Sequence, residues 1–186
     1  MNHILFPITW KCNLTCSGCC ARKNSHVDID KCMQHISTMA GKVPWVYITG
    51  GEPFLLGNVL FNVCDKLRAY DFKVGITTNG TIFNPEIANH IDRLGISLDG
   101  DRSYHDLYRG QGVYDKAVSL FNAVKVQNKC ETVIMSTAFR TNQEALLRLK
   151  KDLKELNPTY WQIQRDINDT TLQILKELQN QENTLL

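Results

Sequence analysis

The chain has 186 residues, of which 43% are hydrophobic, and it carries a formal net charge of +2 at pH 7. A chain of this size and composition can bury its own core as one domain without disulfide staples. Its mild charge argues against a nucleic-acid or membrane-surface partner, and no run of about 18 apolar residues offers a membrane span. The N-terminal segment MNHILFPITWKC turns polar too soon for a signal peptide, so we expect a cytoplasmic protein.

Short β-branched or aromatic runs alternate with longer helical stretches along the chain. The expected strands are Ile4–Trp10, Val43–Thr49, Phe72–Thr78, Leu94–Leu98, Thr132–Phe139 and Thr159–Gln164. The expected helices follow each strand in turn and cover Asp28–Ala40, Leu56–Tyr70, Pro85–Ile91, Val113–Gln127, Gln143–Leu156 and Thr170–Gln179.

Six βα units in succession predict an α/β fold, with a parallel sheet, outer helices and right-handed crossovers. A closed eight-unit barrel usually needs about 250 residues, so we expect a partial (β/α)6 barrel with an open lateral face. Pro7 lies inside the first strand and cannot donate a ladder hydrogen bond, which suits a strand at the open edge. We assign residues 1–167 to this barrel and residues 168–186 to a C-terminal helix and tail.

Several unusual residues directly follow the predicted strands. In parallel α/β folds the carboxyl ends of the strands meet at one mouth, where binding sites form. A cysteine-rich loop follows the first strand and belongs to this mouth. The other residues expected there are Gly50–Pro53, Asn79, Gly80, Asp99, Gly100, Arg140 and Arg165.

Four of the seven cysteines lie between residues 12 and 20. An odd and clustered set is unlike the even, dispersed pattern of a disulfide framework, so we expect reduced thiols. Cys12, Cys16 and Cys19 have the spacing Cys-x3-Cys-x2-Cys. Because four thiolates complete an iron–sulfur cubane, three would leave one position open to a small molecule.

Zinc is the alternative metal for this loop. A tetrahedral zinc site would take its fourth ligand from Cys20, His26 or Cys32. Structural zinc usually shows two Cys-x2-Cys knuckles, and the second is missing from the sequence. The cysteine spacing alone therefore favours an iron–sulfur cluster and leaves zinc open.

Further motifs give the chain a resemblance to the radical S-adenosylmethionine (SAM) enzyme family. The cysteine spacing is followed, in that family's order and on the expected strands, by Gly50-Gly51-Glu52-Pro53, Thr77-Thr78-Asn79-Gly80, Ser97-Leu98-Asp99-Gly100, Tyr104-His105-Asp106 and Arg109-Gly110. One such motif would be weak, but the ordered set over residues 12–110 is very specific. The partial six-unit barrel is also the core that this family would predict.

The resemblance implies a [4Fe–4S] cluster and SAM as cofactors. Three irons would be held by Cys12, Cys16 and Cys19. The amino and carboxylate groups of SAM would chelate the fourth iron, and a one-electron donor of the flavodoxin or ferredoxin type would reduce the cluster. Reductive cleavage of SAM would then give a 5′-deoxyadenosyl radical that abstracts a hydrogen atom from the substrate, so the cofactor carries the hard chemistry.

The resemblance also implies which residues hold SAM. The turn Gly50–Glu52 would present backbone acceptors and a carboxylate to the methionine ammonium. Arg109 would pair with the methionine carboxylate, for which a guanidinium fork is suited. Ser97 and Asp99 share one face of the fourth strand, which would meet the ribose or methionine portion. The other residues expected near SAM or substrate are Thr78 and Asn79.

The cysteines of the chain depart from the family pattern in two ways. Cys20 is an extra thiol beside the cluster, and we expect it not to be a ligand because a fourth thiolate would close the open iron. No second cysteine cluster follows Cys130, so we expect a compact core without an auxiliary-cluster extension. Since the sequence ends soon after the sixth unit, we expect little to cover the mouth, which favours a large substrate or a small one covered by a partner subunit.

We expect a peptide or protein substrate, by analogy with relatives that share the Ser97–Gly100 and Arg109–Gly110 patterns, ahead of a small molecule. Nucleotide modification is an alternative, since compact relatives of the viperin type share Gly50–Phe54 and Arg109–Gly112. Adenosyl transfer to the substrate is a third reading. A non-catalytic iron–sulfur or zinc module would need the cysteines but neither the Gly50–Pro53 turn nor Arg109. We expect no nucleic-acid and no membrane partner.

Overall fold

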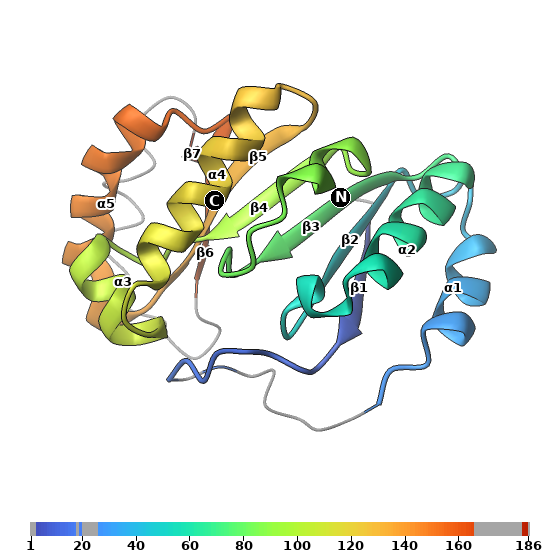
Figure 1. Ribbon diagram of the computed structural model, residues 1–186, viewed down its shortest axis with the longest axis horizontal. Coiled ribbons are helices and arrows are strands. Elements are labelled where there is room, and N and C mark those ends of the chain that lie inside the picture. The colour runs from blue at the N-terminus through green and yellow to red at the C-terminus, as the bar shows by residue number, and fades with distance from the viewer. Residues whose placement is uncertain (1–2, 18, 20–25, 166–183, 186) are drawn as a thin grey trace.

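A computed structural model describes residues 3–17, 19, 26–165 and 184–185 of the chain. Its strands form one sheet in which every neighbouring pair is parallel and the spatial order follows the chain order (Figure 1). The strands are β1 (His3–Thr9), β2 (Trp45–Gly50), β3 (Lys73–Thr78), β4 (Arg93–Ser97), β5 (Glu131–Ala138), β6 (Tyr160–Arg165) and β7 (Thr184–Leu185).

The helices that join these strands lie on one face of the sheet (Figure 1), as right-handed parallel crossovers require. The α-helices are α1 (Ile29–Ser37), α2 (Asn58–Ala69), α3 (Arg102–Arg109), α4 (Val113–Gln127) and α5 (Gln143–Leu156). Three short 3₁₀ helices occur among the described residues, namely η1 (Pro53–Leu56), η2 (Pro85–Asn89) and η3 (Arg140–Asn142). β1 pairs with β2 on one side, so the expected edge position of the Pro7 strand is confirmed.

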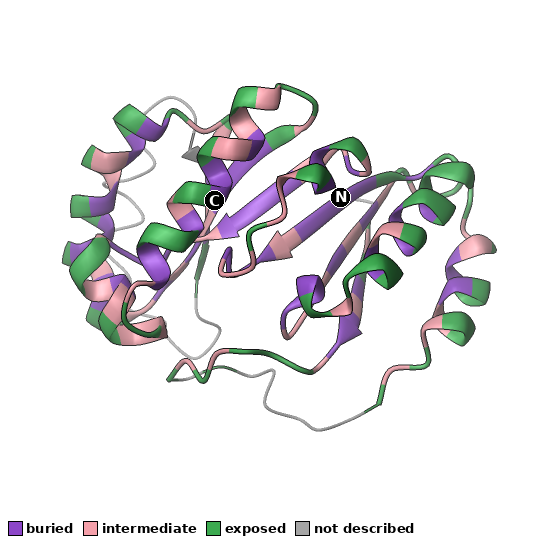
Figure 2. Cartoon of the chain, in the orientation of Figure 1, coloured by how far each residue is buried: buried purple, intermediate pink, exposed green. Residues whose placement is uncertain are grey.

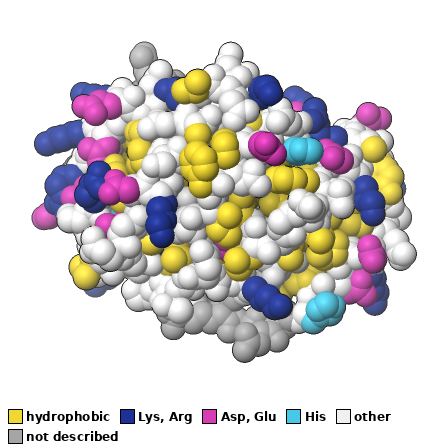
Figure 3. Space-filling view, in the orientation of Figure 1, with side chains coloured by type: hydrophobic (Ala, Val, Ile, Leu, Met, Phe, Trp, Pro, Cys, Tyr) yellow, Lys and Arg dark blue, Asp and Glu magenta, His cyan; other side chains and the backbone are white. Residues whose placement is uncertain are grey.

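The hydrophobic core lies between the sheet and the helices. Alternate strand residues such as Val46, Ile48, Val74 and Ile76 are fully buried and belong to the same cluster as the buried helix residues. Figure 2 shows much of the sheet in the colour of buried residues. Leucines spaced along α5 pack onto the same core. Figure 3 views the helix-bearing face, where hydrophobic side chains gather toward the middle and charged groups lie mainly toward the margins. This core holds the carboxyl ends of the strands in a common edge.

The opposite face of the sheet carries large side chains laid across glycines. A Cβ on Gly75 would lie 2.5 Å from ring atoms of Tyr47, and a Cβ on Gly95 would collide with the sulfur of Met135. Each pair sits on neighbouring strands, so the glycines make room for a side chain that lies flat on the sheet. The large side chains thereby fill the inner face of the sheet at these positions.

The predicted α/β partial barrel is confirmed, with differences in several elements. The helix expected at Pro85–Ile91 is only the short η2, a 3₁₀ helix that ends at Asn89. The structure adds α3, where no helix was expected, and its N-terminus lies next to Asp101. The strand β7 makes the sheet seven-stranded. The helix expected at Thr170–Gln179 lies outside the described residues.

The division at residue 167 stays a prediction. The part of the tail that the structure describes, β7, pairs with β6 and extends the same sheet. Within the described part of the chain, no helix has the length and apolar character needed to cross a membrane.

Candidate functional site

The Gly-Gly-Glu turn at the end of β2 clamps the chain that leads into the cysteine loop. The amide of Gly51 donates to the carbonyl oxygen of Thr9 at 2.6 Å, and the amide of Glu52 donates to that of Lys11 at 2.8 Å. A Cβ on Gly50 would overlap the Thr9 carbonyl, and one on Gly51 would overlap the Lys11 carbonyl. The two glycines therefore allow backbone to pack on backbone directly before the first cysteine of the motif.

Glu52 joins the ends of β2 and β3 from inside the protein. Its carboxylate is fully buried and accepts hydrogen bonds from the amide of Phe54 (3.0 Å), the hydroxyl of Thr78 (2.8 Å) and the amide of Asn79 (2.8 Å). Burial raises the pKa of this carboxyl above its usual range, and the hydrogen bonds offset part of the increase. Direct contact with a ligand ammonium, as predicted for Glu52, would require this carboxylate to become exposed.

Asn79 carries this connection onward to the cysteine loop. Its side-chain Nδ2 donates to Asn13 Oδ1 at 3.0 Å and points at Cys12 Sγ at 3.8 Å. Asn13 in turn donates to Thr81 Oγ1 at 2.8 Å, and the backbone amide of Leu14 points at Cys12 Sγ at 3.4 Å. N–H groups directed at a cysteine sulfur are suited to a thiolate that binds metal, since such outer contacts orient and tune the ligand.

The three motif cysteines lie on one loop and affect each other electrostatically. Cys12 and Cys19 are exposed, and Cys16 is partly buried. Burial raises the pKa of the Cys16 thiol, the guanidinium of Arg109 works against this, and negative charge on Cys19 or Cys12 raises it further. Among residues 3–17, 19, 26–165 and 184–185, no three His, Cys, Asp or Glu side chains are close enough together to hold a metal ion. Cys20 is not among the residues that the structure describes.

The donor set of this loop fits an iron–sulfur cluster. The chain offers three thiols on one loop, two of which act electrostatically on the third, Cys16. It also offers N–H groups directed at Cys12 and a guanidinium whose charge reaches Cys16, which would balance a thiolate-rich centre. Of the other zinc ligands considered, His26 is exposed and Cys32 is partly buried on α1. The cluster expected at Cys12, Cys16 and Cys19 is consistent with this chemistry.

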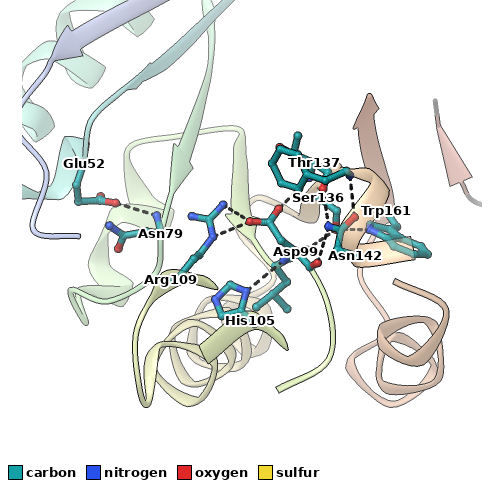
Figure 4. A network of polar contacts seen from close by, with 11 residues as sticks. Glu52, Asn79, Asp99, His105, Arg109, Ser136, Thr137, Asn142 and Trp161 are labelled. Atoms are coloured by element: carbon teal, nitrogen blue, oxygen red, sulfur yellow. Dashed lines mark hydrogen bonds and ion pairs between the residues drawn. The ribbon is translucent and has the colours of Figure 1, made fainter. Parts of the chain in front are cut away.

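Arg109, at the end of α3, reaches back to Asp99 beyond the end of β4 (Figure 4). Its Nε donates to Asp99 Oδ2 at 2.8 Å and its Nη2 lies 2.6 Å from the same oxygen. Burial opposes the charge on Arg109, but the Asp99 carboxylate outweighs burial and raises the pKa of the guanidinium. A permanent cation is thus held at the mouth close enough to Cys16 for its charge to act on that thiol.

An aromatic cluster that sequence reasoning missed borders the same place. Tyr108 lies next to Phe139 with ring centroids 5.4 Å apart, and it stacks on Tyr104 at 6.1 Å. Burial raises the pKa of Tyr108 to about 12, with a further increase from Asp99. Its hydroxyl therefore stays protonated near Asp99 and Arg109. The sequence did not indicate this packing, because Tyr104 was interpreted only as part of a family motif and Phe139 lies far from it along the chain.

Most of the predicted site residues fall into two groups, and the members of each group contact one another. Gly50, Gly51, Glu52, Thr78 and Asn79 form the group that holds the cysteine loop, and Asp99 and Arg109 form the other. Ser97 ends β4 half-buried, in register with Met135 of β5. Arg140 and Arg165 are exposed at the carboxyl ends of β5 and β6, as expected. Sequence reasoning missed Asn13 and Asn142, since a lone asparagine carries no motif.

Comparison with known proteins shows the family of the chain. A sequence model of the Radical SAM superfamily matches residues 6–153, which include the cysteine loop and both groups of site residues. Proteins with this parallel partial barrel and a three-cysteine loop at its mouth form one class of enzyme, which uses a [4Fe–4S] cluster and SAM. The chain belongs to the Radical SAM superfamily.

Individual relatives are more distant. The chain is 28% identical over 176 residues to "AdoMet-dependent heme synthase" of Methanosarcina barkeri, an alignment that covers 86% of this chain and 49% of that protein. It is 31% identical over 131 residues to "Pre-heme d1 synthase" of Dinoroseobacter shibae, covering 62% of this chain and 31% of the relative. The chain thus spans about half or less of the length of these relatives.

Solved structures share the fold. "Native anSMEcpe with bound AdoMet" superposes with a TM-score of 0.71 at 21% identity, covering 88% of this chain and 50% of that one. SuiB of Streptococcus suis bound to S-adenosylmethionine gives a TM-score of 0.74 at 16% identity, covering 90% of this chain and 41% of that one. At these identities the likeness concerns the fold.

Proposed function

We propose that this chain binds a [4Fe–4S] cluster and SAM and cleaves SAM reductively to begin radical chemistry on a substrate. The observation that carries the proposal is the placement of Arg109, which is held by Asp99 and acts on Cys16 of the three-cysteine loop. A cation whose charge reaches the three-cysteine loop suits the carboxylate of an amino acid such as the methionine part of SAM. The proposed cluster ligands are Cys12, Cys16 and Cys19.

The other residues have complementary roles in this proposal. Arg109 binds the methionine carboxylate, and Ser97, Thr78 and the Gly50–Gly51 backbone lie along the rest of SAM. Glu52 contributes by fixing the Asn79 loop, since its carboxylate already accepts three protein hydrogen bonds. When bound and reduced, the cluster with SAM supplies a 5′-deoxyadenosyl radical. A flavodoxin- or ferredoxin-type protein is the proposed reductant, and reduced thiols suit a cytoplasmic location.

A peptide or protein is the proposed substrate. The support comes from solved proteins of the same fold, described as anSMEcpe with AdoMet and a Cp18Cys peptide and as SuiB bound to its precursor peptide SuiA. A haem precursor is the second candidate. It is favoured by three sequence relatives named AdoMet-dependent heme synthase, Pre-heme d1 synthase and Fe-coproporphyrin III synthase. Nucleotide modification and adenosyl transfer remain alternatives from the sequence motifs.

Measuring 5′-deoxyadenosine tests this proposal. The protein is reconstituted anaerobically with iron and sulfide, mixed with SAM and dithionite, and the nucleoside is quantified by liquid chromatography and mass spectrometry. We expect 5′-deoxyadenosine above the background of Cys16→Ala, and faster formation with a synthetic peptide encoded by a short reading frame beside the gene. Stimulation by Fe-coproporphyrin III alone would overturn the peptide proposal. No 5′-deoxyadenosine from a verified cluster would remove the enzyme proposal as a whole.

A further inference from the structure

Asp99 is bonded to several residues at the mouth, and its partners come from three separate segments (Figure 4). Its Oδ2 accepts a hydrogen bond from Nε of Arg109, and its Oδ1 accepts one from the backbone amide of Thr137 at 2.9 Å. Its own amide donates to Nδ1 of His105 at 3.2 Å, and its carbonyl oxygen accepts from Nδ2 of Asn142 at 2.8 Å. The side chain is almost completely buried. Both carboxylate oxygens are therefore already bound to protein.

His105 holds Asp99 from the helix that also carries Arg109. The two residues are four positions apart on α3, so they project from the same side of that helix toward Asp99. Nδ1 of His105 accepts a hydrogen bond, which leaves the proton of the neutral ring on Nε2. Burial lowers the pKa of His105 to about 4, so the ring is neutral at physiological pH.

The other ring nitrogen of His105 makes this arrangement unusual. Nε2 is buried with no hydrogen-bond partner among the described residues, and the ring of Tyr114 stands edge-on at 5.9 Å. Leaving a buried donor unpaired lowers stability. A hydrophobic residue would fill the same space without that cost, so the benefit of the histidine lies in its bond to Asp99.

Asn142 holds Asp99 from the opposite side. Its amide nitrogen donates both to Asp99 O and to Thr137 O, each at 2.8 Å, while its Oδ1 accepts from Phe139 N at 2.7 Å. Asn142 is fully buried, and all three of these partners are backbone groups of other residues at the mouth. Its amide therefore ties the end of β4 to the end of β5 at the point where Asp99 emerges.

We propose that His105 and Asn142 are positioning residues, which fix Asp99 so that it aims the Arg109 guanidinium at the open side of the cysteine loop. Asp99 then serves SAM binding through Arg109, and does not contact SAM itself. This inference rests on the proposed function, because the carboxylate that Arg109 receives is that of SAM. It refines the assignment of Asp99, which the sequence motif placed directly on SAM.

A double-mutant cycle measures whether Asp99 acts through Arg109. SAM dissociation constants are determined by equilibrium dialysis for reconstituted wild type, Asp99→Asn, Arg109→Ala and the double variant, each with its iron content verified. We expect each single variant to weaken binding about tenfold or more. The double variant should lie within about twofold of Arg109→Ala. If the fold-loss of SAM affinity in the double variant equals the product of the two single losses, Asp99 contacts SAM independently of Arg109. That result would overturn the proposal.

The same measurement separates positioning from general destabilisation. His105→Leu should weaken SAM binding, and His105→Asn should recover most of it, because its side-chain oxygen can accept from the Asp99 amide in place of Nδ1. Asn142→Ala should weaken SAM binding about as much as His105→Leu does. If His105→Leu does not fold, Asn142→Ala takes its place in this comparison. Equal defects in His105→Leu and His105→Asn would contradict the proposal.

An experiment on the protein without cofactors keeps this inference separate from the proposed function. In ¹⁵N-labelled protein, the Nε–H resonance of Arg109 is assigned by its loss in Arg109→Lys. We expect slow exchange of this proton with water in wild type and His105→Asn, and fast exchange in His105→Leu and Asn142→Ala. Unchanged protection in both disrupted variants would overturn the positioning role. If wild type binds no SAM, the proposed function fails while this measurement still decides the positioning.

Discussion

Single backbone contacts determine where the cysteine loop begins. Gly50 and Gly51 let the end of β2 approach the carbonyl groups of Thr9 and Lys11, and Glu52 bonds to the loop after β3. The Gly-Gly-Glu motif thus acts first on the protein itself, since the close approach that requires glycine is to another stretch of backbone.

Gly51→Ala tests this contact. Its backbone angle is not among those that require glycine, so the added methyl is harmful only because it overlaps the Lys11 carbonyl. We expect the free energy of unfolding of the cofactor-free protein to fall by about 2 kcal/mol or more. We also expect most of the iron to be lost after reconstitution. Chemical denaturation and iron analysis measure the two effects.

Gly41→Ala is the matched control. Gly41 has a positive φ of 73° and nothing within 4 Å of an added Cβ, so only backbone strain of roughly 1 kcal/mol is expected. Its iron content should equal that of wild type. If Gly51→Ala loads iron as well as Gly41→Ala does, the clamp on the cysteine loop is not needed for the cluster.

Residues that belong to a contiguous motif could be predicted from the sequence, and those joined only by tertiary contacts could not. The cysteine spacing and the Gly-Gly-Glu turn are visible locally because neighbouring residues act together. Asn142 lies 43 residues beyond Asp99, and its role depends on how β4 and β5 end side by side. Asn13 likewise meets Asn79 only after β1 and β3 fold into one sheet.

At the scale of elements, α3 is the helix that the hydrophobic periodicity of the sequence did not predict. The segment is rich in polar side chains and therefore has no clear apolar stripe, yet the helix presents His105 and Arg109 on one side.

A cluster around Arg93 joins several strands at the end of the sheet opposite the mouth. The guanidinium of Arg93 lies 4.5 Å from the ring centroid of Trp45 and 5.0 Å from that of Tyr160, and its Nε donates to Glu131 at 2.6 Å.

Arg93→Ala should therefore destabilise the sheet and spare the site. Arg93 is mostly buried and bridges β2, β4, β5 and β6, so we expect the free energy of unfolding to fall by roughly 2–3 kcal/mol. SAM affinity of the reconstituted protein should be unchanged. Urea denaturation and equilibrium dialysis measure the two quantities.

Arg102→Ala is the control for removal of an arginine. Its ion pair with Asp115 is more than half exposed on both sides, so we expect a loss below about 1 kcal/mol. An Arg93→Ala variant no less stable than Arg102→Ala would show that the contacts of Arg93 with Trp45 and Tyr160 do not stabilise the sheet.

At the scale of the whole molecule, the chain is a radical SAM core that matches about half or less of its longer relatives. Its parallel strands bring the cysteine loop, the buried Glu52 and the Asp99–Arg109 pair to one edge of a single sheet. Fold class and site location could be predicted because βα alternation and strand-end motifs are both local signals. Substrate choice could not, because no local motif of the chain identifies the group that reacts.

Electron paramagnetic resonance of the reduced cluster, with and without SAM, tests the central claim most directly. In wild type and in Cys32→Ala, whose altered residue lies away from the motif on α1, we expect a [4Fe–4S] signal whose shape changes when SAM is added. Cys16→Ala should show no such cluster, and Arg109→Ala should keep the cluster but need more SAM for the change. A wild-type signal that saturating SAM leaves unaltered would contradict the claim that this three-cysteine loop leaves one iron open for SAM.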